Sequence, residues 1–236
     1  MRYLALVVLS GCGRLAFDPV GDTSVTDSAV PDGVSSSDLV VYMPFDPFLL
    51  DEIARGHDAN CFGGPCPTRT ASPHGMSAVF TGQECLQIPY SPEFQLTDFT
   101  TSAWVLVGMS PGDGDVFSRP LDGATTSQNS FEMFYEGTTT SWQFALGPIA
   151  AGTPAETSGW HHIAATFGGG TLRVYVDGTM HQTVGGLTPM YGTDPLFIGC
   201  DLDNNVGVAQ FRGEIDEVRL YDRALSSAEI MTLATE

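Results

Sequence analysis

Short runs of β-branched and aromatic residues, separated by turn residues, recur along most of this chain and restrict it to an all-β fold. The clearest run covers residues 172–176, where Leu172, Val174 and Val176 alternate with Arg and Tyr. This is the period of a strand with one buried face. The Asp-Gly dipeptide that follows it is a strong signal for a tight hairpin turn. Many such runs at regular spacing predict a two-sheet antiparallel sandwich over residues 39–236.

One helix is predicted, close to the C-terminus. Ser226 and Glu229 have the spacing of a capping box, in which each residue satisfies a backbone N–H of the other. Ile230 and Leu233 then share one helical face. We expect this short helix to dock on the sandwich.

The first residues predict export rather than folded structure. Residues 1–11 hold one charge, Arg2, then a short apolar run and small residues before Cys12. This pattern resembles a bacterial lipoprotein signal peptide. We therefore expect Cys12 to be lipidated and to anchor the chain at the cell envelope; an ordinary secretion signal is the alternative. Residues 12–38, acidic and rich in Ser and Asp, are expected to form a disordered tether.

The charge of the chain limits its partners. Its formal net charge is -19, and all nine basic residues are arginines. Such a surface repels phosphate backbones, so nucleic acid is not expected to bind. We expect contact with the membrane only through the lipid on Cys12.

The cysteines agree with export. Four remain beside Cys12, an even number that predicts two disulfides with three possible connectivities. Cys61 and Cys66 lie in one Gly/Pro loop and are expected to pair, which by elimination leaves Cys85 with Cys200. Zinc is the competing interpretation, but no second close pair of Cys or His follows.

In their order, several pieces of the chain resemble the laminin-G-like, concanavalin A-like jelly-roll family. The pieces are YMPFD (42–46), GMSAVFTG (75–82), FTTSAWV (99–105), GWHHIAATF (159–167), LRVYVDG (172–178), LFIG (196–199) and FRGEIDEVRLY (211–221). The resemblance implies a concanavalin A-like jelly roll. It leaves function open, because this fold hosts lectins, adhesion modules and glycosidase accessory domains.

The last predicted strand carries acids that could be catalytic. Some jelly-roll glucanases place two glutamates and an aspartate on one strand face, as acid/base and nucleophile. Glu214 and Asp216 begin such a pattern, but positions 218 and 219 are Val and Arg. Strict alternation places Glu217 on the face opposite Asp216. We therefore predict that the chain is not an enzyme.

Calcium is the one cofactor that the resemblance implies. In the family, a structural Ca²⁺ often joins the early Asp-rich loop to the last strand. Here Asp46, Asp51 and Asp216 would be its carboxylate ligands, since Ca²⁺ takes six to eight oxygens. Asp216 is expected among core residues, where a carboxylate must be neutralised. Arg55 is the alternative to the ion.

Other polar and aromatic residues are candidates for metal or sugar binding. Asp201, Asp203 and Asn205 begin like an EF-hand loop but lack its Gly and its final Glu, so a solvated turn is expected. Adjacent His161 and His162 must point to opposite faces of a strand. Aromatic candidates for sugar stacking are Tyr135, Trp142 and Tyr191, with Asn129, Asn204 and Asn205 near them in sequence; none is assigned as a ligand-binding residue.

These observations predict a non-catalytic surface recognition module, tethered as a lipoprotein, that binds a glycan or an extracellular protein. The alternative is an envelope structural protein with no small ligand. A glycosidase-like enzyme is a weaker alternative.

Overall fold

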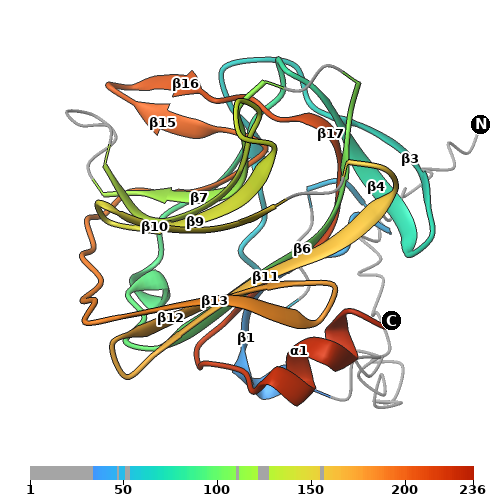
Figure 1. The fold of residues 1–236 in the computed structure, drawn as a ribbon. Helices are drawn as coiled ribbons and strands as arrows, with labels where there is room; N and C mark the ends of the chain where they lie inside the picture. The colour runs from blue at the N-terminus through green and yellow to red at the C-terminus, as the bar shows by residue number, and fades with distance from the viewer. Residues whose placement is uncertain (1–33, 47, 51–53, 110–111, 122–127, 155–156) are drawn as a thin grey trace, which may run out of the picture.

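The chain folds into two antiparallel sheets that pack face to face, with one short helix outside them (Figure 1). The structure is a computed structural model and describes residues 34–46, 48–50, 54–109, 112–121, 128–154 and 157–236. The predicted all-β sandwich with one C-terminal helix is confirmed. No helix in these ranges has the length and apolar character needed to cross a membrane.

The first sheet has eight strands in the order β13-β12-β11-β6-β17-β4-β3, and β1 pairs with the second half of β17. Their bounds are β1 (Leu39–Met43), β3 (Thr68–Ser72), β4 (Gly75–Thr81), β6 (Phe99–Val107), β11 (Trp160–Gly168), β12 (Thr171–Val176), β13 (Thr179–Gly185) and β17 (Arg212–Tyr221). The Asp177-Gly178 turn between β12 and β13 has positive φ at both residues, as predicted.

The second sheet has seven strands in the order β10-β9-β8-β7-β14-β5-β2. Their bounds are β2 (Asn60–Cys61), β5 (Leu86–Ile88), β7 (Gly114–Pro120), β8 (Asn129–Glu136), β9 (Ser141–Leu146), β10 (Ile149–Pro154) and β14 (Leu196–Ile198). A separate hairpin, β15 (Asp201–Asp203) and β16 (Val206–Val208), joins neither sheet and lies over β7 (Figure 1).

Apolar side chains divide among three clusters. The largest fills the space between the sheets and includes Phe99, Phe117 and Trp142. A second lies between the eight-stranded sheet and helix α1 (Ser227–Leu233), whose Ile230 and Leu233 are fully buried. The predicted capping box of Ser226 and Glu229 begins this helix. The third cluster surrounds the Cys85–Cys200 disulfide.

The ordered domain begins before residue 39, earlier than the expected end of the tether. Val34 is buried against the second cluster, and a 3-10 helix, η1 (Ser36–Asp38), precedes β1. Asp38 also forms an ion pair with Arg223. A second 3-10 helix, η2 (Pro92–Phe94), precedes β6. Cys12 and residues 1–33 lie outside the described residues.

A β-bulge interrupts strand β17 at Glu217. Asp216 pairs with Trp104 of β6 and Arg219 pairs with Ser102, so two residues of β17 oppose one residue of β6. Glu217 has a φ of 54°, unusual for a residue other than glycine. Because of the bulge, the side chain of Val218 packs in the main core, whereas the side chains of Asp216 and Glu217 lie outside it. The expectation that Asp216 shares the core-facing side with Val218, opposite Glu217, is therefore wrong.

Candidate functional site

Three acids from different strands meet on the outer face of the seven-stranded sheet, beneath the β15–β16 hairpin. They are Asp115 of β7, Glu132 of β8 and Asp201 of β15, called here the carboxylate cluster. Asn129 links two of them, because its Nδ2 donates to Glu132 at 2.7 Å and to Asp201 at 3.0 Å. Ser118 Oγ donates to Asp201 at 3.0 Å. Backbone register therefore creates an acidic site that no local motif encodes.

Asp115 is the group in this cluster that lacks a donor. Its side chain is 1% exposed, and no donor in the described part of the chain reaches either carboxylate oxygen. Burial, together with the charges of Glu132 and Asp201, raises its pKa well above the ordinary value. Burial raises the pKa of the neighbouring Glu132 as well. Within the described residues no three acidic, His or Cys side chains are arranged to hold a metal ion.

We expect Asp115→Asn to stabilise the protein at neutral pH and to lose that advantage in acid. The folded state holds a proton that the unfolded chain releases above the ordinary pKa of 3.8. Stability therefore falls as pH rises above that value. The variant should gain about 1–3 kcal/mol at pH 7–8, because a neutral amide at this buried position carries neither a charge nor a proton cost. Thermal melts of both proteins from pH 4 to 8 check this; an equal loss at every pH would contradict a raised pKa of Asp115.

Asp216, one of the residues expected to bind calcium, lies on the other sheet, in β17. Asp216 is buried, and its Oδ2 accepts a hydrogen bond from Ser72 Oγ at 2.5 Å. Burial raises its pKa to about 7, with the charges of Glu217 and Asp46 adding to the effect. Asp46 accepts the N–H of Met76 at 2.6 Å. The structure thus brings Asp46 near Asp216, whereas Asp51 lies outside the described residues.

Arg55 does not neutralise Asp216, which corrects the alternative drawn from sequence. Its guanidinium pairs with Glu93 at 3.0 Å and with Asp222 at 2.9 Å, and its Nε donates to the carbonyl of Leu39. Asp216 has no basic partner among the described residues. The raised pKa of Asp216 is the physical sign of this missing countercharge.

The other acids of β17 each contact a different neighbour. Glu214 accepts a hydrogen bond from Ser77 Oγ at 2.7 Å. Glu217 accepts one from Tyr42 at 2.7 Å and pairs with Arg219 at 2.5 Å. Tyr42, Glu217 and Arg219 line a hollow of ≈ 380 Å³ beside the bulge. The side chains of Glu214, Asp216 and Glu217 therefore have different hydrogen-bond partners.

The aromatic side chains that were candidates for sugar stacking pack in the core or contact other groups of the protein. Trp142 and Tyr135 are buried in the main core. Tyr191 donates its hydroxyl to the carbonyl of Leu96 and carries the guanidinium of Arg119 over its ring. These three residues therefore do not form a surface for sugar stacking. Their proximity in sequence to asparagines did not predict whether their rings are exposed.

The paired histidines separate as strand geometry requires. His162 is fully buried beside Trp104, and burial lowers its pKa to about 3. His161 contacts the carboxylate of Asp177 through Nδ1 at 2.9 Å. The two imidazoles therefore do not line a common site.

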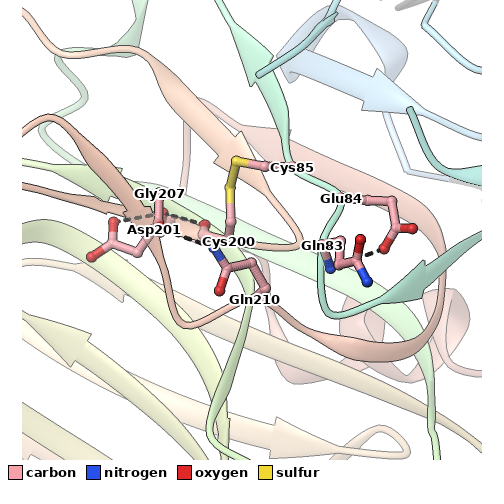
Figure 2. Close-up of a disulfide and its surroundings, with 8 residues drawn as sticks. Gln83, Glu84, Cys85, Cys200, Asp201, Gly207 and Gln210 are labelled. Atoms are coloured by element: carbon pink, nitrogen blue, oxygen red, sulfur yellow. Dashed lines mark hydrogen bonds between the residues drawn. A yellow bond between two sulfur atoms is a disulfide. The ribbon is translucent and has the colours of Figure 1, made fainter. Parts of the chain in front are cut away.

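Both predicted disulfides are confirmed, with pairs Cys61–Cys66 and Cys85–Cys200. Figure 2 shows that the second bridge lies directly before Asp201, which belongs to the carboxylate cluster. Asn204 and Asn205 both have positive φ and form the exposed turn of the β15–β16 hairpin, whereas Asp201 is buried in β15; the solvated-turn interpretation therefore holds for the asparagines and is wrong for Asp201.

Sequence reasoning missed Asp115 and Glu132. They lie 17 positions apart on neighbouring strands, where pairing of Ser118 with Glu132 sets their separation. Only the alternation of Glu132 with Phe131 and Met133 shows that it faces outward. Contact with Asp201 could not be predicted, because it depends on where the separate hairpin folds.

The fold and its two outer faces define a lectin-type β-sandwich. A family model for the concanavalin A-like lectin/glucanases superfamily matches residues 80–231, and the chain belongs to this family. Human neuronal pentraxin-1 is 27% identical over 148 residues, which cover 58% of this chain and 33% of the pentraxin. The chain thus spans about a third of the length of such relatives.

Solved structures show the same fold. Domain 4 of the extracellular arabinanase AbnA from Geobacillus stearothermophilus, in complex with arabinotriose, superposes with a TM-score of 0.63 at 17% identity and covers 84% of this chain and 98% of that domain. Trypanosoma rangeli sialidase gives a TM-score of 0.64 at 22% identity, with 85% of this chain and 33% of that enzyme covered. At these identities the likeness concerns the fold alone.

Proposed function

We propose that this chain is a non-catalytic recognition module that binds a glycan. The observation that carries the proposal is that Glu214, Asp216 and Glu217 are each engaged by a different neighbour. The most buried acid of the second sheet, Asp115, is inaccessible beneath a hairpin. Support also comes from the arabinotriose held by a domain of the same fold.

The outer face of the seven-stranded sheet suits a polar ligand. Phe134 and Glu136 lie on the outer side of β8, beyond the carboxylate cluster, and Gln143 lies beside Phe134 on β9. Gln143 donates to Ser141 at 2.8 Å and lies over Gly152 of β10, whose lack of a side chain leaves room for it. Amides and hydroxyls next to a partly exposed aromatic ring are the groups that recognise sugar hydroxyls and apolar ring faces.

The location proposed for this module is the bacterial envelope. Lipidation of Cys12 would anchor the chain, and residues between Cys12 and Val34 would separate the sandwich from the membrane surface. The intact mass of protein purified from membranes tests this part, since acylation at Cys12 adds a defined mass that Cys12→Ser removes.

A test of the recognition proposal uses a glycan array with and without EDTA, followed by incubation of any bound oligosaccharide with the protein. We expect selective binding and intact oligosaccharide. Absence of binding on the array, with and without EDTA, would favour the alternative of an envelope structural protein with no small ligand. Hydrolysis that disappears in Glu214→Gln would show a glycosidase.

We further propose that a structural Ca²⁺ is held between Asp46 and Asp216. Asp216 is a buried carboxylate with no basic partner among the described residues and has Asp46 near it, an arrangement that fits a cation. Ser72 Oγ, 2.5 Å from Asp216, is a further oxygen. The ion would supply charge neutralisation between the loop after β1 and strand β17, rather than chemistry.

Calcium is expected to raise the thermal stability of the protein, and Asp216→Asn should abolish this effect. At a concentration 100 times the Kd, an ion that binds only the folded state adds about 2.7 kcal/mol. Melting curves in Ca²⁺ and in EDTA measure it, with Asp201→Asn as the control that should retain the shift. An unchanged melting temperature in the unmodified protein would contradict calcium binding at this site.

A further inference from the structure

A small hollow lies beside the Cys85–Cys200 disulfide and the tip of the β15–β16 hairpin. It has a volume of ≈ 260 Å³ and is formed by the Cys61–Cys66 loop, the turn before Cys85 and the tip of the hairpin. Figure 2 shows Gln210 just below the disulfide and Gln83 to its right. The side chains that give it chemical character are Phe62, Gln83, Asn205, Val206 and Gln210.

The polar part of this hollow consists of amides. Gln210 Nε2 donates to the carbonyl of Gly207 at 2.8 Å, which fixes the amide and leaves its oxygen as an acceptor. Gln83 and Asn205 are exposed, and their side-chain amides make no hydrogen bond within the described residues. Each amide offers both donors and an acceptor. No charged side chain lines the hollow, so its chemistry matches a neutral ligand rich in hydroxyls.

The apolar part is one aromatic ring and one aliphatic side chain. Phe62 is held edge to face against Phe197, with ring centroids 5.3 Å apart. Val206 is 60% exposed at the hairpin tip. Between them Gly207 has no side chain, and a Cβ there would lie 3.9 Å from Phe62 Cε1 and 3.8 Å from Gln210 Nε2. The glycine therefore keeps the space between ring and amide open.

The walls of this hollow are held in place before any ligand arrives. Both disulfides border it, and the N–H of Phe62 donates to the carbonyl of Cys85 at 2.8 Å. The buried carboxylate of Glu84 accepts the N–H of Thr81 at 2.6 Å and that of Gln83 at 3.2 Å, which fixes the turn. Such preorganisation reduces the entropy lost on binding.

We propose that this hollow is a subsite for one neutral glycosyl residue, with amides on its hydroxyls and Phe62 against its C–H groups. The proposal rests on the glycan-binding function proposed above and assigns it a place. Lipids and acidic sugars are disfavoured, since the walls carry three amides and no basic group.

The test measures affinity by calorimetry for a defined panel of sugars. The panel contains neutral arabino-, xylo-, gluco-, galacto- and mannooligosaccharides, with sialyllactose and oligogalacturonide as acidic probes. We expect a neutral sugar to bind, and Gln83→Ala and Asn205→Gly each to weaken its binding about tenfold, the effect of one lost hydrogen bond. Gly207→Val should fill the hollow and remove binding. Asn204→Gly is the matched control, because it changes the same turn outside the hollow and should bind normally.

Each outcome separates this subsite from the wider proposal. Neutral-sugar binding that survives Gln83→Ala, Asn205→Gly and Gly207→Val would overturn the subsite and leave glycan recognition standing. Binding confined to the acidic probes would overturn the neutral class. No binding of any sugar would overturn both. Because Gln83 and Asn205 are exposed, and glycine tolerates the φ of 63° at position 205, these two variants should fold even if Gly207→Val does not.

Discussion

Arg219→Met is expected to lower the free energy of unfolding by about 3–5 kcal/mol, because it leaves a buried carboxylate without its partner. Arg219 is 1% exposed, and its Nη2 contacts Glu217 at 2.5 Å and Glu236 at 2.9 Å. Its guanidinium also lies over the ring of Tyr42, 4.6 Å from the centroid. Urea denaturation of both proteins at pH 7 measures the loss.

Two further variants define the cause of that loss. Arg212→Met makes the same change at an exposed position of the same strand and should alter stability by no more than about 0.5 kcal/mol. Adding Glu217→Gln to Arg219→Met should recover part of the stability, since the unpaired charge is then gone. If Arg219→Met lowers the free energy of unfolding by less than about 1 kcal/mol, water must reach Glu217 and solvate its charge at the bulge.

Removing the Cys85–Cys200 disulfide should cost about 4–5 kcal/mol, against about 2 kcal/mol for Cys61–Cys66. The two bridges close segments with sequence separations of 115 and 5, and a longer loop loses more freedom in the unfolded chain. Alanine is the suitable replacement, since Cys85 and Cys200 are buried among Phe197 and Leu202. Denaturation of the two double variants compares them directly.

The stability losses of the two double variants show how each bridge stabilises the protein. If the short bridge proves as costly as the long one, chain entropy does not explain their effect, and packing around Phe62 does. If removal of neither disulfide changes stability, noncovalent contacts alone hold the β15–β16 hairpin in place. Retention of the fold by each variant is checked from its circular dichroism before any affinity is measured.

Much of the architecture follows from local sequence patterns. The alternation at Leu172, Val174 and Val176 produced strand β12, and the Asp-Gly dipeptide produced its turn. Ser226 and Glu229 capped helix α1 as their spacing predicts. These features depend on residues close together in sequence, where propensity and hydrogen-bond geometry act directly.

The errors arose where long-range packing overrides a local rule. Alternation fails at Glu217, because the bulge inserts one extra residue into β17. Arg55 pairs with Glu93 and Asp222, since the packing of distant segments, not sequence order, decides which acids it reaches. Asp115 meets Glu132 and Asp201 only through sheet register and the placement of a separate hairpin. Neither the burial of Asp115 beneath the hairpin nor the amide-lined hollow could be predicted from sequence.

The measurement that tests the central claim most directly is titration of the intact protein with neutral oligosaccharides, combined with chromatography of the sugars recovered afterwards. We predict saturable binding of at least one neutral sugar, recovered at its original length. Absence of binding across the panel, or recovery of shortened products that Glu214→Gln abolishes, would contradict a non-catalytic glycan-recognition module.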